Sequence, residues 1–466
     1  MKSFLTFVAA MLLTVAARAE PARSTLEAAL LTAVRDAQFG QVLDFGAGNE
    51  SRPVRPAAPI AHPPNVDVAV LQLDAEGRLI ASANVLLSRD FPDGQLVLLG
   101  KNTGASLVRF RRWDIERSDG GTFSAEGKQL SRKGWTNNPP LTVADDIVPG
   151  RTNAPYQFMA PYPASLFKLM VAFHVLRLVD AGNLTLDTEY AFRTSLTNSD
   201  RRRIRNWLEP MITVSDNHAT QALLALFHDR NEIVKLNQEF RDLGLGTLQI
   251  NHTSPIDGRG WQPGQIHMTA FDTARLLWII EGGPGELWRG ANGEPVTAKL
   301  LSDSSREFLK KLLSDQGFND ALTTANFPGA PNVRPGIPSR VATRWINPLN
   351  GFVNVDNLNY GVDIRAANPK AEVNFAHKTG LTFNYGSDAG IVTSLPGQPF
   401  RHYIVAFLGN LGYRYTDGAF ATRTNYPAFD DRSPVSYTQR IPALGKAIDE
   451  ALKKISAPEK KQALPP

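Results

Sequence analysis

Three short strings in this 466-residue sequence could together carry out nucleophilic catalysis: S-L-F-K at 165–168, S-D-N at 215–217 and K-T-G at 378–380. At average composition, a chain of this length would hold about two S-x-x-K matches by chance, but only about 0.1 each of S-D-N and K-T-G. S-x-x-K alone is therefore weak evidence for a catalytic site. One copy of each string, in this order, indicates a catalytic site.

Ser165 and Lys168 have the chemistry of a nucleophile and its base. Ser165 follows Pro163 and is expected to begin a helix, with its oxygen near the positive end of the helix dipole. Lys168 lies one turn later on the same face, among apolar neighbours. Burial and a second cation both lower the pKa of a lysine, which can then accept a proton. Lys378 is the candidate second cation.

Ser215 and Asn217 are expected to complete proton transfer and substrate binding. Ser215 would pass a proton between Lys168 and the leaving nitrogen, and the Asn217 amide would hold an amide of the substrate. The alternative is that S-D-N simply caps the helix that follows. Ser165 and Lys168 have similar alternatives, as a helix cap and as a lysine reaching outward to solvent.

The K-T-G string is expected to bind a substrate carboxylate. Lys378 and Thr379 offer a charge and a hydroxyl, and Gly380 would let the substrate backbone approach closely. Backbone N–H groups of Ser165 and Leu381 would form an oxyanion hole. Alternatively, K-T-G is only the end of a strand.

The sequence lacks the residue patterns of other common catalytic sites. The sequence has no cysteine, no H-E-x-x-H, no P-loop and no G-x-S-x-G, and its eight histidines do not have metal-ligand spacing. We therefore expect neither a metal nor a cofactor.

Residues 1–19 have the pattern of a secretory signal peptide: a charged start, a short apolar run and an Ala-Arg-Ala end. The apolar run is too short to span a bilayer. The mature protein is therefore expected to be periplasmic or secreted, without a membrane span. The absence of cysteine excludes a disulfide framework and a lipid-attachment cysteine.

The charge of the chain is only mildly basic. Removing Lys2 and Arg18 with the signal lowers the formal charge from +5 to +3 (5 − 2). The basic run RRRIR at 201–205 lacks interleaved aromatic residues, so we expect a solvated helix face and no binding of nucleic acid.

The order of elements predicts an α+β protein. Strand patterns at 66–110 and again at 371–410 flank a helical block at 163–282, and a last helix follows. Strands from both ends can share one antiparallel sheet, giving two lobes with a cleft between them. The expected segments are a signal peptide (1–19), an N-terminal helix and Pro/Gly-rich linker (20–65), N-terminal strands with an insertion (66–160), a helical lobe (161–285), a sheet lobe with the C-terminal helix (286–455) and a disordered tail (456–466).

With these motifs, the sequence resembles the penicillin-recognising serine hydrolases, and within them the class A β-lactamases. The resemblance runs from about Pro161 to Asn410 and includes MTAFDTARLL, AHKTG…SDAGIV and YIVAFLGN. It implies the β-lactamase/transpeptidase fold, an antiparallel sheet lobe with an inserted all-helical lobe. The implied roles are nucleophile for Ser165, base for Lys168, proton relay for Ser215, substrate contact for Asn217, and carboxylate site for Lys378 with Thr379.

Two features depart from the class A pattern. Those enzymes carry a glutamate about 34 residues after the Asn of S-D-N, which activates the deacylating water, whereas residues 251–264 here contain no glutamate. Asp257 is the one carboxylate in that stretch, either a replacement base or a structural loop residue. Insertions at about 90–156 and 340–370 also lengthen the chain near the expected cleft entrance.

The leading hypothesis is a β-lactamase-like serine hydrolase that forms an acyl-enzyme on Ser165. The alternatives are a periplasmic D,D-peptidase or another amidase or esterase of this fold, and a penicillin-binding sensor that is acylated without turnover. The expected partner is a small β-lactam or a peptidoglycan peptide, and the expected state is a monomer.

Overall fold

The computed structural model describes residues 24–44, 58–99, 105–113, 142–193, 198–418 and 438–456. The expected signal peptide and nearly all of the expected C-terminal tail lie outside these residues. So do parts of the expected linker and of the first insertion.

A six-stranded antiparallel sheet forms the centre of the molecule, in the order β16-β17-β18-β3-β4-β5. Its strands are β3 (Val66–Leu73), β4 (Leu79–Ser88), β5 (Phe91–Leu96), β16 (Val373–Leu381), β17 (Gly386–Ser394) and β18 (His402–Gly409). The first strand, β3, pairs with the last, β18. This confirms that strands from both ends of the chain share one sheet, and with it the α+β class.

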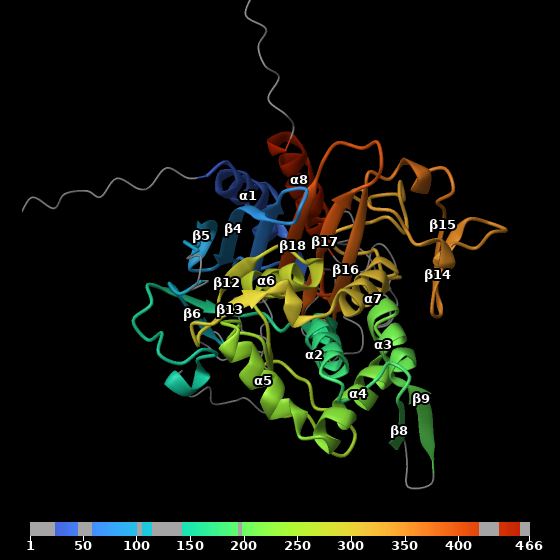
Figure 1. The fold of residues 1–466 in the computed structure, drawn as a ribbon. Helices are drawn as coiled ribbons and strands as arrows, with labels where there is room; N and C mark the ends of the chain where they lie inside the picture. Colours follow the sequence, from blue (N-terminus) through green and yellow to red (C-terminus); the bar gives the residue numbers. More distant parts are fainter. Residues whose placement is uncertain are drawn as a thin grey trace, which may run out of the picture.

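Helices cover both faces of this sheet, which explains why β3 and β18 are buried along their whole length. Helix α6 (Ala270–Glu281) packs on β3, β17 and β18, and α7 (Asp303–Ser314) lies along β16. Helices α1 (Thr25–Asp36) and α8 (Arg440–Ile455) lie side by side against the sheet (Figure 1). Helix α1 begins with a capping box formed by Ser24 and Glu27.

The predicted helical block contains α2 (Lys168–Asp180), α3 (Ile204–Thr213), α4 (Asn217–Asp229) and α5 (Glu232–Asp242). A 3-10 turn, Ala164–Phe167, precedes α2. Helix α2 is buried over most of its circumference, as its apolar sequence predicts. None of the described helices is long and apolar enough to cross a membrane.

The basic run at 201–205 corrects one expectation. Residues 201–203 belong to strand β9 (Ser199–Arg203), which pairs with β8 (Glu189–Arg193), and the helix begins only at Ile204. Alternating burial along β9 exposes Arg201 and Arg203. The run is solvated as predicted, but mainly on a hairpin rather than on a helix.

Smaller elements surround this core. Strand β6 (Val108–Arg111), expected from the sequence, pairs in parallel with β7 (Tyr156–Met159) outside the central sheet. The insertion after α7 has its own apolar cluster, which includes Phe318, Val353 and Tyr360. The remaining strands are β1 (Leu43–Asp44), β2 (Ala58–Pro59), β10 (Gln249–Ile250), β11 (Ile266–His267), β12 (Glu286–Arg289), β13 (Pro295–Thr297), β14 (Phe352–Val355), β15 (Leu358–Asp363) and β19 (Tyr415–Thr416).

Candidate active site

The three sequence motifs meet at the hydroxyl of Ser215. Lys168 Nζ lies 3.2 Å from Ser215 Oγ, and Lys378 Nζ lies 3.0 Å from the same oxygen. Lys168 Nζ also donates to Asn217 Oδ1 at 2.8 Å. Lys168 at the start of α2, Ser215 in the turn before α4, Asn217 at the start of α4 and Lys378 on β16 therefore form a single hydrogen-bonded cluster.

Lys168 is fully buried, and oxygen atoms of Ser215 and Asn217 surround its amine. The backbone oxygen of Ser215 accepts from Nζ at 2.6 Å, and Asn217 Oδ1 accepts at 2.8 Å. The Ser215 hydroxyl, 3.2 Å away, is a third partner of Nζ, so the amine lies within hydrogen-bond distance of a serine oxygen that could exchange a proton with it.

Ser215 has a backbone conformation that few side chains adopt, with φ at 58°. In this conformation both its carbonyl oxygen and its hydroxyl face Lys168 Nζ. Asp216 then caps α4, because its Oδ1 accepts from the N–H groups of His218 and Ala219 at 2.6 and 3.1 Å. The capping and catalytic interpretations of S-D-N are thus compatible, since the capping residue lies between the two that contact Lys168.

Ser165 is half-buried in the 3-10 turn before α2, so it begins the helical segment as expected. The preceding residue, Ala164, has φ at 48°. Backbone strain of this kind costs about 1–3 kcal/mol and persists where surrounding contacts enforce it. Here the Ser387 hydroxyl on β17 donates to Pro163 O at 2.6 Å and fixes the chain just before Ala164.

Gly380 touches the same turn. A Cβ at this position would lie 2.3 Å from Pro163 O and 2.6 Å from Leu166 N. The sequence interpretation assigned this glycine to close approach of a substrate. The structure shows a further reason for glycine, because the backbone on either side of Ser165 occupies the space of a side chain. Close approach of a substrate stays a prediction. Gly380 lets the K-T-G strand pack against the turn Ala164–Phe167, which carries the predicted nucleophile and is called the nucleophile turn below.

Strand alternation separates the two faces of β16. Lys378 donates to Ser215 on one face and also to Thr379 O at 2.8 Å. His377 lies on the opposite face, where its Nδ1 is 2.7 Å from Asp388 and both side chains are fully buried. Leu381 is the last residue of β16. Its part in an oxyanion hole stays a prediction.

Asp257 does not join this cluster. Its Oδ1 accepts from the Arg259 N–H at 3.1 Å, and its Oδ2 lies 3.6 Å from Arg259 Nε. Burial opposes its ionisation, but hydrogen bonds from Ser254 and Arg259 outweigh this effect and lower the pKa of Asp257. These contacts all lie within its own loop, so the geometry favours the structural interpretation of Asp257.

The loop that carries Asp257 nevertheless packs against residues on either side of Ser165. The Trp261 ring lies 5.6 Å from the Phe167 ring, measured between centroids, and Trp261 O accepts from the Tyr162 hydroxyl at 3.4 Å. Sequence reasoning did not identify Trp261 or Ser387. A single tryptophan in a loop does not indicate which residue it will contact. Ser387 donates its hydrogen bond to Pro163, which lies more than 200 positions away in the sequence.

The described part of the chain has no group of three or more His, Asp or Glu side chains placed to hold a metal ion. The groups brought together by the three motifs are instead two amines, an amide and the Ser215 hydroxyl, close to the turn that carries Ser165. This set suits proton transfer and covalent attack by serine.

Comparisons with known proteins agree with the motifs. A family model described as the beta-lactamase enzyme family matches residues 159–414, more than half of the chain. No curated protein matches the sequence.

Solved structures with partial similarity include PBP-A, at 21% identity over 63% of this chain and 82% of the other, with a TM-score of 0.37. They also include a beta-lactamase from Chitinophaga pinensis DSM 2588, at 19% identity over 64% and 86%, and one from Sphaerobacter thermophilus DSM 20745, at 17% over 66% and 85%, each with a TM-score of 0.37. The family-model match, which includes all three motifs, establishes that the chain belongs to the beta-lactamase enzyme family.

Proposed function

We propose that this protein is a serine hydrolase that is acylated on Ser165 by β-lactam-like amides. The observation that carries the proposal is the convergence of Lys168 and Lys378 on Ser215 Oγ, at 3.2 and 3.0 Å. This arrangement links a buried amine beside the nucleophile turn to a hydroxyl and to a second amine that can bind a carboxylate.

The proposed reaction uses each of these groups. The Lys168 lone pair accepts the Ser165 hydroxyl proton as Ser165 Oγ bonds to the amide carbon. The carbon–nitrogen bond then breaks, and the nitrogen takes a proton from Ser215, which is reprotonated by Lys168. Lys378 and Thr379 bind the substrate carboxylate, Asn217 binds its amide, and N–H groups of Ser165 and Leu381 stabilise the oxyanion.

A second candidate function differs in what happens to the acyl-enzyme. Residues 251–264 hold no glutamate, and Asp257 is paired with Arg259 in its own loop. This favours an acyl-enzyme that hydrolyses slowly, as in a D,D-peptidase, a related amidase or esterase, or a penicillin-binding sensor. The signal-like residues 1–19 support a place of action outside the cytoplasm, where β-lactams and peptidoglycan peptides are met.

Mixing the mature protein with a chromogenic cephalosporin tests both candidates, if colour and intact mass are followed together. Continuous colour without a lasting adduct supports a β-lactamase. A burst of one equivalent with a lasting adduct supports the slowly deacylating alternatives. A folded protein that gives neither colour nor adduct contradicts the proposal.

A further inference from the structure

Among the described residues, the first half of strand β4 has no strand paired with its outer side. Strand β5 pairs with β4 between Val85 and Ser88, and one further hydrogen bond, from Val97 N to Asn84 O, lies just beyond it. Among the described strands, β3 is then the one partner of the stretch Leu79–Ser82. Leu79 and Ile80 on this stretch are 38% and 58% exposed. An exposed apolar strand edge is a template for pairing with another chain unless it is protected.

The hydrogen bonds of β4 show which of its main-chain N–H and C=O groups point away from β3. Asn84 O accepts from Val97 N at 2.9 Å, so the polar groups of Asn84 face away from β3. Antiparallel strands alternate the direction of these groups, so Ser82, two residues earlier, presents its N–H and C=O on the same open side. One extended segment placed beside β4 would find a donor and an acceptor there.

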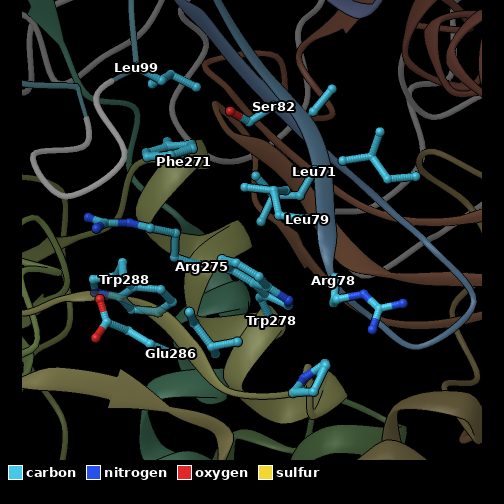
Figure 2. A pocket seen from close by; sticks show the side chains of 14 residues that line it. Leu71, Arg78, Leu79, Ser82, Leu99, Phe271, Arg275, Trp278, Glu286 and Trp288 are labelled. Carbon is cyan, nitrogen blue, oxygen red and sulfur yellow. The ribbon is translucent and has the colours of Figure 1, made fainter.

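A pocket of about 500 Å³ lies next to this edge, between the β3–β4 hairpin, α6 and β12. Figure 2 shows its apolar wall, which comes from both the sheet and the helix. The wall includes Leu71, Leu79, Phe271, Trp278, Leu287 and Trp288. The volume is typical of a site that accepts a large side chain or a small ligand. Neither Ser165 nor the cluster of Lys168, Ser215, Asn217 and Lys378 lines it.

Arg275 lines this pocket, and some of the N–H donors of its guanidinium group have no acceptor within the described part of the chain. Its Nη2 donates to Gly244 O and to Asp272 Oδ1, both at 2.6 Å. Its Nε and Nη1 are buried and have no hydrogen-bond partner among the described residues. The guanidinium lies 5.1 Å from the rings of both Phe271 and Trp288 (Figure 2). Buried donors without acceptors are costly, so a carboxylate supplied by a ligand would be favourable here.

We propose that β4 and this pocket bind an extended peptide by strand addition. The peptide pairs with the open edge at Ser82 and inserts one large apolar side chain between α6 and the hairpin. An acidic residue two positions away, on the same face of the added strand, meets Arg275. Strand addition combines main-chain hydrogen bonds with pockets for alternate side chains, and both parts are present here. The site is independent of the chemistry at Ser165.

The test is selection of a phage-displayed library of random nonapeptides on the full mature chain, with a matched pair of variants. Ser82→Pro removes the outward N–H without removing a donor from the β3–β4 ladder, and proline is tolerated on strand edges. Ser82→Ala keeps that N–H and is the control. Leu79→Asp changes the exposed apolar wall and serves as a second variant. Near-UV circular dichroism checks the fold of each variant.

We expect selected peptides to share a large apolar residue and an acidic residue at positions i and i+2. They should bind the wild type and Ser82→Ala equally, and Ser82→Pro and Leu79→Asp at least about tenfold more weakly, the loss expected for one or two hydrogen bonds or an apolar contact. Peptides that bind folded Ser82→Pro and Leu79→Asp as tightly as wild type would overturn the proposal, as would a library that yields no binder preferring the wild type. Cephalosporin acylation is measured separately, so failure of that reaction leaves this test unchanged.

Discussion

Lys168 and Lys378 direct their ammonium nitrogens at one oxygen, Ser215 Oγ, although one residue begins a helix and the other lies on the outer strand of the sheet. Both lysines are fully buried. The Ser215 hydroxyl therefore lies between two buried amines. Lys168 also contacts Asn217, and Lys378 lies on the strand that would bind substrate.

Replacing each lysine by methionine should separate their roles. Lys168→Met removes the base, so the rate constant of acylation at saturating cephalosporin should fall by about 10²–10⁴-fold. Lys378→Met removes the carboxylate partner, so the concentration giving half-maximal acylation should rise by about tenfold to a hundredfold. Stopped-flow acylation over a range of substrate concentrations measures both quantities. Equal effects of the two variants on both quantities would contradict this division.

Ser215 offers a test in which stability and activity change in opposite directions. Ser215→Gly removes the hydroxyl and also relieves the positive φ, so acylation should slow by at least about tenfold while the free energy of unfolding rises by up to about 1 kcal/mol. Ser215→Ala is the matched variant that loses the hydroxyl but keeps the strain. Its acylation should slow equally without the gain in stability. A Ser215→Gly protein with wild-type acylation kinetics would exclude the relay role.

Gly380 should tolerate no side chain. A methyl group there meets backbone atoms on both sides of Ser165, so Gly380→Ala should displace the nucleophile turn, slow acylation by at least about tenfold and cost about 1–3 kcal/mol of stability. Gly418→Ala is the control, because its Cβ would meet open space. Denaturant unfolding and acylation rates are compared for the two variants. Matching behaviour would show that the turn can move freely.

Ser387 is expected to be a positioning residue. Its hydroxyl holds Pro163 O at 2.6 Å and also lies 3.1 Å from Gly380 O, so it joins the nucleophile turn to the K-T-G strand. Ser387→Ala should lower the acylation rate constant by about tenfold and leave the half-saturating concentration nearly unchanged. Ser387→Thr keeps a hydroxyl and should restore the rate. An alanine variant as fast as wild type, or a threonine variant as slow as alanine, would count against this role.

Asp67 should make stability depend on pH. Burial raises its pKa from 3.8 to about 6, although Ala270 N and Asn84 donate hydrogen bonds to it. Between these two pH values the folded chain holds a proton that the unfolded chain has released. Stability from this group is therefore complete below about pH 4 and is lost as the pH rises through 6, by up to about 3 kcal/mol.

Asp67→Asn removes that titration. Urea unfolding from pH 4 to 7 should give a difference in unfolding free energy, wild type minus variant, that decreases as the pH rises. A difference that is constant with pH would show that Asp67 does not titrate in this range. The hydrogen bonds that Asp67 accepts come from Asn84 and Ala270, not from Lys168, Ser215 or Lys378, so acylation provides an independent check of the fold.

The sequence predicted much of this arrangement because its strongest signals are local. The largely apolar runs of β3, β18 and α2 follow directly from burial, and the rare strings S-D-N and K-T-G identify residues that do meet. The basic run at 201–205 is expected on a solvated helix face, but residues 201–203 belong to a strand. This strand is defined by its pairing with β8.

Long-range contacts account for the rest. The contact of Gly380 with Pro163 and Leu166, the Ser387 hydrogen bond and the packing of Trp261 on Phe167 all join segments far apart in the chain. No local pattern encodes which segment a glycine or serine will touch. For the same reason the sequence could not distinguish a structural role of Asp257 from a role as base. Its contacts with Arg259 in the same loop favour the structural role.

Acylation of Ser165 can be observed directly by peptide mapping with tandem mass spectrometry, after brief exposure of the mature protein to benzylpenicillin and acid quenching. We expect one penicilloyl group per chain on the peptide containing Ser165, and none on that peptide in Ser165→Ala. An adduct on another residue, or a folded wild-type protein that remains unmodified, would contradict the proposed role of Ser165.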